Sequence, residues 1–383
     1  MHTHTNIKRL AAIIRANVSK NIVFVAGWRA KAVHAGLGLA LMALPSASLF
    51  AQSPFLPPPP PFVSTVPSNG DVNPYGVVFV PPAFPAGGTT QSGDILVSNF
   101  NNNQNLQGTG TTIIKVAPNG NTSLFFQGSA PGLTAALGVV QAGLIFIGNL
   151  PTTDGTPNTV QPGSVLVLND KGQLLGTLAG QYGIDGPWGM AIHDQNDHGQ
   201  IFISNVLSGT VIRLDVNLFA KTGSMQVRDS VVISSGYAHR TDPAALVLGP
   251  SGLAYDAVHD ILYVAESADN TIREIKGAGA LTSDAGPGVV IYQDVVHLHG
   301  PLDLAIAPNG HLLVANSDGS NATPTQPSEI VEFTTAGAFV TEFSVDPNNG
   351  GAFGLALQSI GGGTRFAAVD DDMNTLLIST IIP

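Results

Sequence analysis

The 383-residue chain contains no cysteine, and only 11% of its residues are charged. The lack of cysteine excludes disulfides, thiolate metal sites and thiol catalysis. The sequence also lacks the G-x-S-x-G elbow of serine hydrolases, a P-loop, and a G-x-G-x-x-G fingerprint after a strand. Glycine and proline are abundant instead, with 44 and 27 copies, and 44% of the residues are hydrophobic. This composition indicates many short strands joined by turns, in a chain that can bury a core.

The first 51 residues include no acidic residue, although they hold six of the 15 lysines and arginines. A basic stretch precedes the apolar run AGLGLALMALPSASLFA, which is typical of a bacterial-type signal peptide cleaved after Ala51. At roughly 16 residues with a proline inside, the run is short for a membrane span. We therefore expect an exported protein, periplasmic or secreted, with no stable membrane span after cleavage of residues 1–51. An uncleaved N-terminal anchor is the alternative.

Residues 52–383 contain the other nine basic residues and all 26 acidic ones, which gives this part of the chain a net charge of about −17. Nucleic acid is not an expected partner, because phosphate binding requires clustered lysine and arginine. The partners left open are a protein, a glycan or a small-molecule ligand. Residues 52–61 are predicted to be a proline-rich spacer, because the run Pro57–Pro61 favours an extended polyproline helix.

One pattern occurs six times between Asn73 and Asp372: an apolar strand, a turn, and a second apolar strand that ends near a polar residue. Repetition every 50 to 60 residues or so is typical of solenoids, propellers or arrays. A third strand follows in most copies and a fourth in four of them, and four antiparallel strands make one propeller blade. The sequence thus predicts an all-β, six-bladed β-propeller of four-stranded antiparallel blades over residues 62–383. The residues that head the first strands are Gly76, Gly138, Gly189, Gly252, Asp303 and Gly354.

The sixth unit ends after three strands, at TLLISTIIP. The missing strand is predicted upstream of the first unit, where Phe62–Val66 has the layout of a fourth strand. Pairing this segment with the last blade would close the ring and remove two free sheet edges.

Three motifs carry a resemblance to a known family: PSGLAYD from Pro250, ILYVAESADNTIREI from Ile261, and PNGHLLVAN from Pro308. With them the chain resembles the NHL-repeat and gluconolactonase-like six-bladed propellers, most clearly in units three to five. The resemblance implies a propeller over roughly residues 62–383. It says little about function, because one fold hosts many unrelated chemistries.

Polar residues end the second strands, on the face where the first strands begin, so we expect a ring at one mouth of the channel. Its members are Asn99, Asn149, Asn205, Glu266, Asn316 and Asp370. Carboxylate and amide oxygens that converge suit calcium, whereas the alternative is local bonding of each side chain to the next turn. The family resemblance implies that Glu266, Asn205, Asn316 and Asp370 are the metal ligands.

A largely apolar set of residues precedes the strand-heading positions. Its members are Tyr75, Leu137, Trp188, Ser251, Leu302 and Phe353. Such a set predicts either a vestibule for a small organic ligand, with Trp188, Tyr75, Phe353 and Ser251 as ligand-binding residues, or a cap on the core.

Three histidines, His239, His297 and His299, fall in connections between units. They could bind zinc, and His297 or His299 could act as a catalytic base, whereas solvated surface histidines are the plainer interpretation. Two classes of function are therefore carried forward. The first is a non-enzymatic binding or scaffold propeller with its ligand site at one mouth. The second is a calcium- or zinc-dependent hydrolase or lyase that acts on a small lactone or ester.

Overall fold

The computed structural model describes residues 53–56, 62–317, 329–348 and 350–382. By its contacts the chain divides into two units, Met1–Ala51 and Gln52–Pro383. The first unit lies outside the described residues, so the predicted signal peptide is not seen, and the same holds for the proline run 57–61. In the described part of the chain, no helix has the length and apolarity that crossing a membrane requires.

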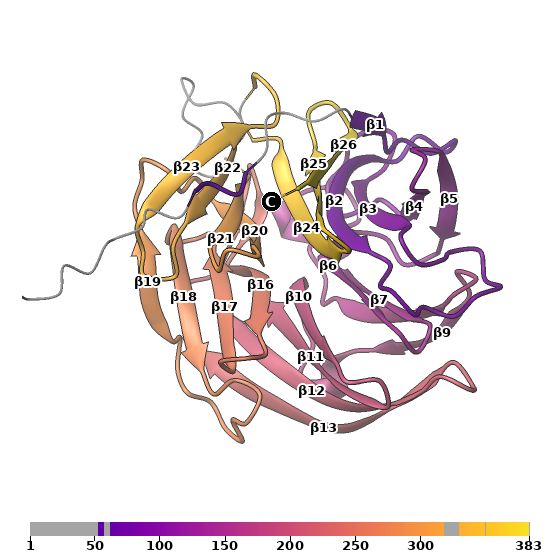
Figure 1. The fold of residues 1–383 in the computed structure, drawn as a ribbon, viewed down its shortest axis with the longest axis horizontal. Coiled ribbons are helices and arrows are strands. Elements are labelled where there is room, and N and C mark those ends of the chain that lie inside the picture. Colours follow the sequence, from indigo (N-terminus) through magenta and orange to yellow (C-terminus); the bar gives the residue numbers. More distant parts are fainter. Residues whose placement is uncertain (1–52, 57–61, 318–328, 349, 383) are drawn as a thin grey trace, which may run out of the picture. The chain divides into compact units, whose positions relative to one another are not determined.

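Six four-stranded antiparallel sheets, numbered here as blades 1 to 6, follow one another along the second unit (Figure 1). Blade 1 contains β2 (Val72–Phe79), β3 (Ile95–Asn101), β4 (Thr112–Val116) and β5 (Thr122–Gln127). Blade 2 contains β6 (Leu133–Val140), β7 (Leu144–Asn149), β8 (Ser164–Asn169) and β9 (Leu174–Leu178). Blade 3 contains β10 (Pro187–Asp194), β11 (His198–Asn205), β12 (Thr210–Phe219) and β13 (Ser224–Ser235).

Blade 4 contains β16 (Pro250–Asp256), β17 (Ile261–Glu266), β18 (Thr271–Lys276) and β19 (Val289–Gln293). Blade 5 contains β20 (Pro301–Ile306), β21 (Leu312–Asn316), β22 (Glu329–Phe333) and β23 (Phe339–Ser344). Blade 6 contains β24 (Ala352–Ile360), β25 (Gly363–Asp370), β26 (Thr375–Ile381) and β1 (Phe62–Ser64). Outside the blades lie a small hairpin, β14 (Arg240–Asp242) with β15 (Leu246–Leu248), and two short 3-10 helices, η1 (Pro157–Thr159) and η2 (Gly180–Tyr182).

The first strands of neighbouring blades contact one another in a closed cycle: β2, β6, β10, β16, β20, β24 and again β2. Buried hydrophobic clusters fill the spaces between adjacent blades. Inner strands therefore have both faces covered, and every residue of β3, β7 and β21 is buried, whereas the outer strand β9 is almost wholly exposed. This gradient explains why the second strands read as continuous apolar runs. The predicted all-β six-bladed propeller is confirmed.

The ring closes as the sequence predicts, because β1 pairs antiparallel with β26, from Phe62 opposite Leu377 to Ser64 opposite Thr375. The first strands begin with a bulge and then approach each other closely. A Cβ atom on Gly189 would lie 2.1 Å from the carbonyl oxygen of Ser251, and one on Gly252 would lie 2.4 Å from the Cα atom of Asp303. Glycine heads these strands because the inner wall leaves no room for a side chain there.

Candidate functional site

The strand register brings the six predicted ring residues to the same end of their blades. Each lies opposite the start, or nearly the start, of its blade's first strand. The pairs are Pro74 with Asn99, Leu133 with Asn149, Pro187 with Asn205, Pro250 with Glu266, Pro301 with Asn316, and Ala352 with Asp370. This end of the propeller is called the mouth below.

The asparagine side chains at the mouth form hydrogen bonds with the backbone of the connection that leads into their own blade. The Asn205 amide oxygen accepts the N–H of Asp185 at 3.1 Å, and its nitrogen donates to the carbonyl oxygen of Gly183 at 2.8 Å. Asn316 repeats this arrangement with the N–H of His299 at 3.1 Å and the carbonyl oxygen of His297 at 2.6 Å. These amides therefore stabilise the connections between blades, which the sequence pattern alone did not indicate.

Asn149 and Asn99 make related contacts. The nitrogen of Asn149 donates to the carbonyl oxygen of Pro131 at 3.1 Å, while its oxygen accepts the N–H of Ser164 at 3.0 Å. The nitrogen of Asn99 donates to the carbonyl oxygen of Thr65 at 3.2 Å, and its buried oxygen has no partner in the described part of the chain. Bonds of this kind link the start of the third strand and the incoming connection to one side chain.

The two acids of the ring are buried and hold their protons more tightly than free carboxyls. Burial raises the pKa of Glu266 to about 8, and the nearby Asp269 adds to the shift. One oxygen of Glu266 accepts the N–H of Ala268 at 2.9 Å, whereas Oε2 has no partner among the described residues. Burial also raises the pKa of Asp370, to about 6. Burying a carboxylate is costly, so burial shifts both groups towards the neutral acid, and the shift is smaller for Asp370, which accepts the N–H of Met373 at 3.1 Å.

The four predicted calcium ligands are not brought together as a cluster of free oxygens. Asn205 and Asn316 use their oxygens for backbone N–H groups, and Asp370 accepts the N–H of Met373. Oε2 of Glu266 has no partner among the described residues. The Asn99 oxygen also has no partner within the described ranges, but it lies in blade 1, across the ring from blade 4. Within the described ranges no group of three or more histidines and carboxylates is placed to hold a metal ion. Calcium binding stays a prediction.

The aromatic residues predicted as a vestibule form one buried cluster at the mouth. Trp188 is 1% exposed and Phe353 is 8% exposed. The ring of Tyr75 lies 5.5 Å from that of Trp188, edge to face, and 4.7 Å from that of Phe353. Blades 1, 3 and 6 thus meet across the mouth. Ser251 lies elsewhere in the wall: its buried hydroxyl donates to the carbonyl oxygen of Pro301, 2.8 Å away in blade 5.

The β14–β15 hairpin contributes to this cluster. Leu246 and Val247 are buried in the same hydrophobic cluster as Trp188. Across the ring, the Gln107 side chain of blade 1 donates to the carbonyl oxygen of Ala244 at 2.9 Å. Leu246 has a φ of 63°, a left-handed conformation that bulky residues rarely adopt. The apolar run ALVL in the connection 236–249 is the signal for this hairpin, which sequence reasoning missed.

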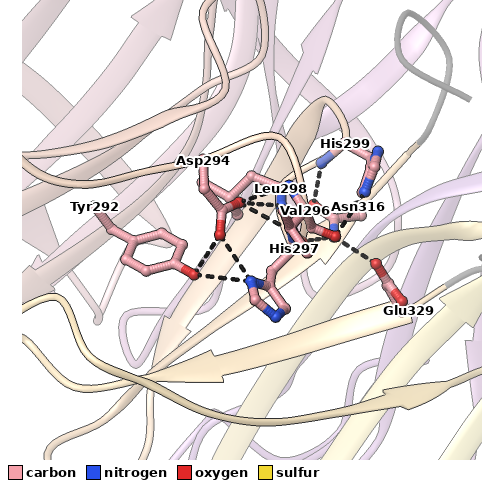
Figure 2. A network of polar contacts seen from close by, with 8 residues as sticks. All are labelled: Tyr292, Asp294, Val296, His297, Leu298, His299, Asn316 and Glu329. Atoms are coloured by element: carbon pink, nitrogen blue, oxygen red, sulfur yellow. Dashed lines mark hydrogen bonds and ion pairs between the residues drawn. The ribbon is translucent and has the colours of Figure 1, made fainter. Parts of the chain in front are cut away.

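The two neighbouring histidines do not converge (Figure 2). The ring of His297 lies beside Asp294, with Nδ1 2.7 Å from Oδ2, and beside the Tyr292 hydroxyl at 3.3 Å, whereas the ring of His299 lies on the other side, near Asn316. Burial alone would raise the pKa of Asp294, but hydrogen bonds from His297 and from backbone N–H groups outweigh it and lower the pKa to about 2. Asp294 therefore orients His297 as a base would need to be oriented. His239 contacts the carbonyl oxygen of Tyr237 at 3.0 Å.

Asp303 stands in blade 5 where the other blades have glycine. Its carboxylate accepts the N–H of Leu304 at 2.9 Å and that of Leu355, in blade 6, at 3.0 Å. Burial nevertheless raises the pKa of Asp303 to about 7. The side chain thus links two blades in the inner wall.

Six antiparallel blades around one axis, closed by an N-terminal strand, define the protein as a six-bladed β-propeller. No protein-family model matches the chain, and no curated protein sequence matches it. Solved structures with a similar arrangement include the calcium-binding protein regucalcin from Agrobacterium tumefaciens (13% identity, TM-score 0.48, covering 85% of this chain and 97% of that one). A luciferin-regenerating enzyme (10%, TM-score 0.47, 85% and 95%) and a nidogen/laminin complex (10%, TM-score 0.43, 74% and 92%) are also similar.

Proposed function

We propose that the protein is a non-enzymatic binding propeller whose ligand site is the mouth beneath the β14–β15 hairpin. The observation that carries the proposal is the left-handed backbone at Leu246, whose side chain is buried in one hydrophobic cluster with aromatic residues from three blades. Backbone strain of this kind concentrates at ligand clamps. Aromatic side chains in a site with few charged residues suit a small, largely apolar organic molecule, which would displace the Leu246 side chain because the rings are packed in the free protein.

The polar groups of the mouth support binding over catalysis. The asparagine side chains stabilise the blade connections, as described above, and Asp294 and His297 lie in the connection between blades 4 and 5. A reaction would need a nucleophile, a base and an oxyanion donor within reach of one substrate. The asparagines, Asp294 and His297 are explained more simply as structural residues around an apolar mouth than as a catalytic group.

Tryptophan fluorescence tests this proposal. The chain has two tryptophans, Trp28 and Trp188, so a chain without residues 1–51 carries only Trp188. Titration with a neutral apolar dye should quench this fluorescence to saturation. Leu246→Gly should strengthen the quenching several-fold, because glycine adopts a positive φ freely and the change vacates space above the rings.

A matched control is Leu174→Gly, which removes an exposed leucine from the outer strand β9 and should leave the quenching unchanged. Quenching that does not saturate, or that Leu246→Gly leaves as it is, would rule out a ligand site at the mouth.

Export is part of the same proposal. The acid-free basic segment and the apolar run before Ala51 support cleavage into a periplasmic or secreted form. Intact-mass measurement of the protein recovered from a bacterial periplasm should give a chain that begins at Gln52. A recovered chain that still carries residues 1–51 would contradict cleavage and favour an N-terminal anchor.

The second candidate is a calcium- or zinc-dependent hydrolase or lyase for a small lactone or ester. The observation in its favour is the buried Glu266 oxygen without a described partner, which a cation would satisfy. His297, oriented by Asp294, would be its base. The response of stability to calcium, compared between the wild type and Glu266→Gln, distinguishes the two candidates.

A further inference from the structure

A buried carboxylate in blade 5 holds the segment that precedes the first strand. Glu332 of β22 is fully buried and accepts the N–H of Phe55 at 2.8 Å and that of Leu56 at 3.0 Å. These residues lie 277 and 276 positions away in sequence. Figure 1 shows this short indigo segment beside β22.

Two side chains from the β20–β21 turn complete the site. His311 is 3% exposed, and its Nδ1 lies 2.6 Å from Oε1 of Glu332. The Asn309 amide nitrogen donates to the same oxygen at 3.2 Å and to the carbonyl oxygen of Ser53 at 3.4 Å. Oε2 of Glu332, by contrast, bonds only Phe55 and Leu56 within the described ranges. A buried carboxylate oxygen needs partners, and the two peptide N–H groups supply them to Oε2.

The segment Ser53–Leu56 fits the Glu332 site in two respects: the side chains of Phe55 and Leu56 are apolar, and only one alignment of its N–H groups is possible. Phe55 and Leu56 pack against the hydrophobic cluster between blades 5 and 6. From Pro54 to Pro61, all residues except Phe55 and Leu56 are prolines, which have no backbone N–H. The two N–H groups of this stretch are therefore those that Glu332 accepts, which leaves one possible alignment.

We propose that Glu332, His311 and Asn309 form a receptor site for an extended apolar peptide, which the chain's own Ser53–Leu56 occupies. The site recognises two consecutive backbone N–H groups flanked by prolines, together with two apolar side chains. Ser53–Leu56 is then a displaceable arm held at a binding site, in addition to the strand pairing of β1.

Hydrogen exchange of the full chain, read by mass spectrometry, tests the site directly. A proteolytic fragment from Ser53 to Pro61 reports the amides of Phe55 and Leu56 almost alone, because the prolines have none. These amides should exchange at least about tenfold faster in Glu332→Gln than in the wild type, since the buried acceptor is weakened. Glu342→Gln, an exposed acid on the next strand, should match the wild type.

Competition then tests whether the arm is displaceable. An excess of the synthetic peptide Ser-Pro-Phe-Leu-Pro should accelerate exchange of Phe55 and Leu56 in the wild-type chain, and a peptide with serine in place of both apolar residues should not. Equal exchange in the wild type and Glu332→Gln would overturn the site. Protection that the excess peptide leaves intact would overturn the receptor and make the arm a fixed part of the fold. The competition experiment uses the unmodified protein, so its result holds even if Glu332→Gln fails to fold.

Discussion

Trp188→Ala is expected to lower the free energy of unfolding by about 3–5 kcal/mol, the usual cost of removing a fully buried large aromatic side chain. Trp188 is 1% exposed and meets Tyr75 and Phe100 edge to face at 5.5 and 5.4 Å. Its neighbours come from different blades and from the hairpin above, so they cannot close the gap by moving a single strand. Urea unfolding followed by circular dichroism measures the change.

Phe219→Ala is the control, because Phe219 is 45% exposed at the end of β12 and should lose less than about 1 kcal/mol. A similarly small loss for Trp188→Ala would contradict a packed cluster at the mouth. It would mean that the rings line an open vestibule which tolerates a missing side chain.

The blades could be predicted because their signals are local. Apolar runs, turn residues and strand-heading glycines recur within each unit, and the unfinished sixth unit points to a strand upstream of the first. The structure bears this out in β1, which pairs over Phe62–Ser64. The fourth strand of blade 4, β19, was not among those predicted, because its unit lacks a plain closing motif.

What could not be predicted depends on contacts between distant parts of the chain. The hairpin is held by Gln107 from another blade, and the arm by Glu332, which lies near the other end of the sequence. Repeat alignment places Asn205 and Asn316 at equivalent positions, but it does not reveal that their partners are the incoming connections. Position in a repeat predicts where a side chain lies, while its partners depend on packing.

Glu266→Gln is expected to stabilise the protein by roughly 3 kcal/mol at pH 7, and by little at pH 4. The pKa of Glu266 is raised from 4.5 to about 8, chiefly by burial. Below pH 4.5 the carboxyl is protonated in both the folded and the unfolded state, so folding carries no penalty. As the pH rises towards 8, the unfolded chain ionises freely while the folded chain resists, and stability falls. Glutamine keeps the shape and removes this loss. Denaturation between pH 4 and 8, with Glu342→Gln as the exposed control, measures it.

Calcium in the same experiment decides between the two functions. A cation bound at Glu266 would favour ionisation, lower its pKa and stabilise the wild type by mass action. Millimolar calcium would then raise the wild-type melting temperature at pH 7, and Glu266→Gln would abolish that rise, as the hydrolase candidate requires. A binding propeller instead gives a variant more stable than the wild type at pH 7, with no response of either to calcium. If the variant gains no stability with rising pH and calcium has no effect, Glu266 ionises as readily in the folded protein as in the unfolded chain, which would contradict both the raised pKa and the metal site.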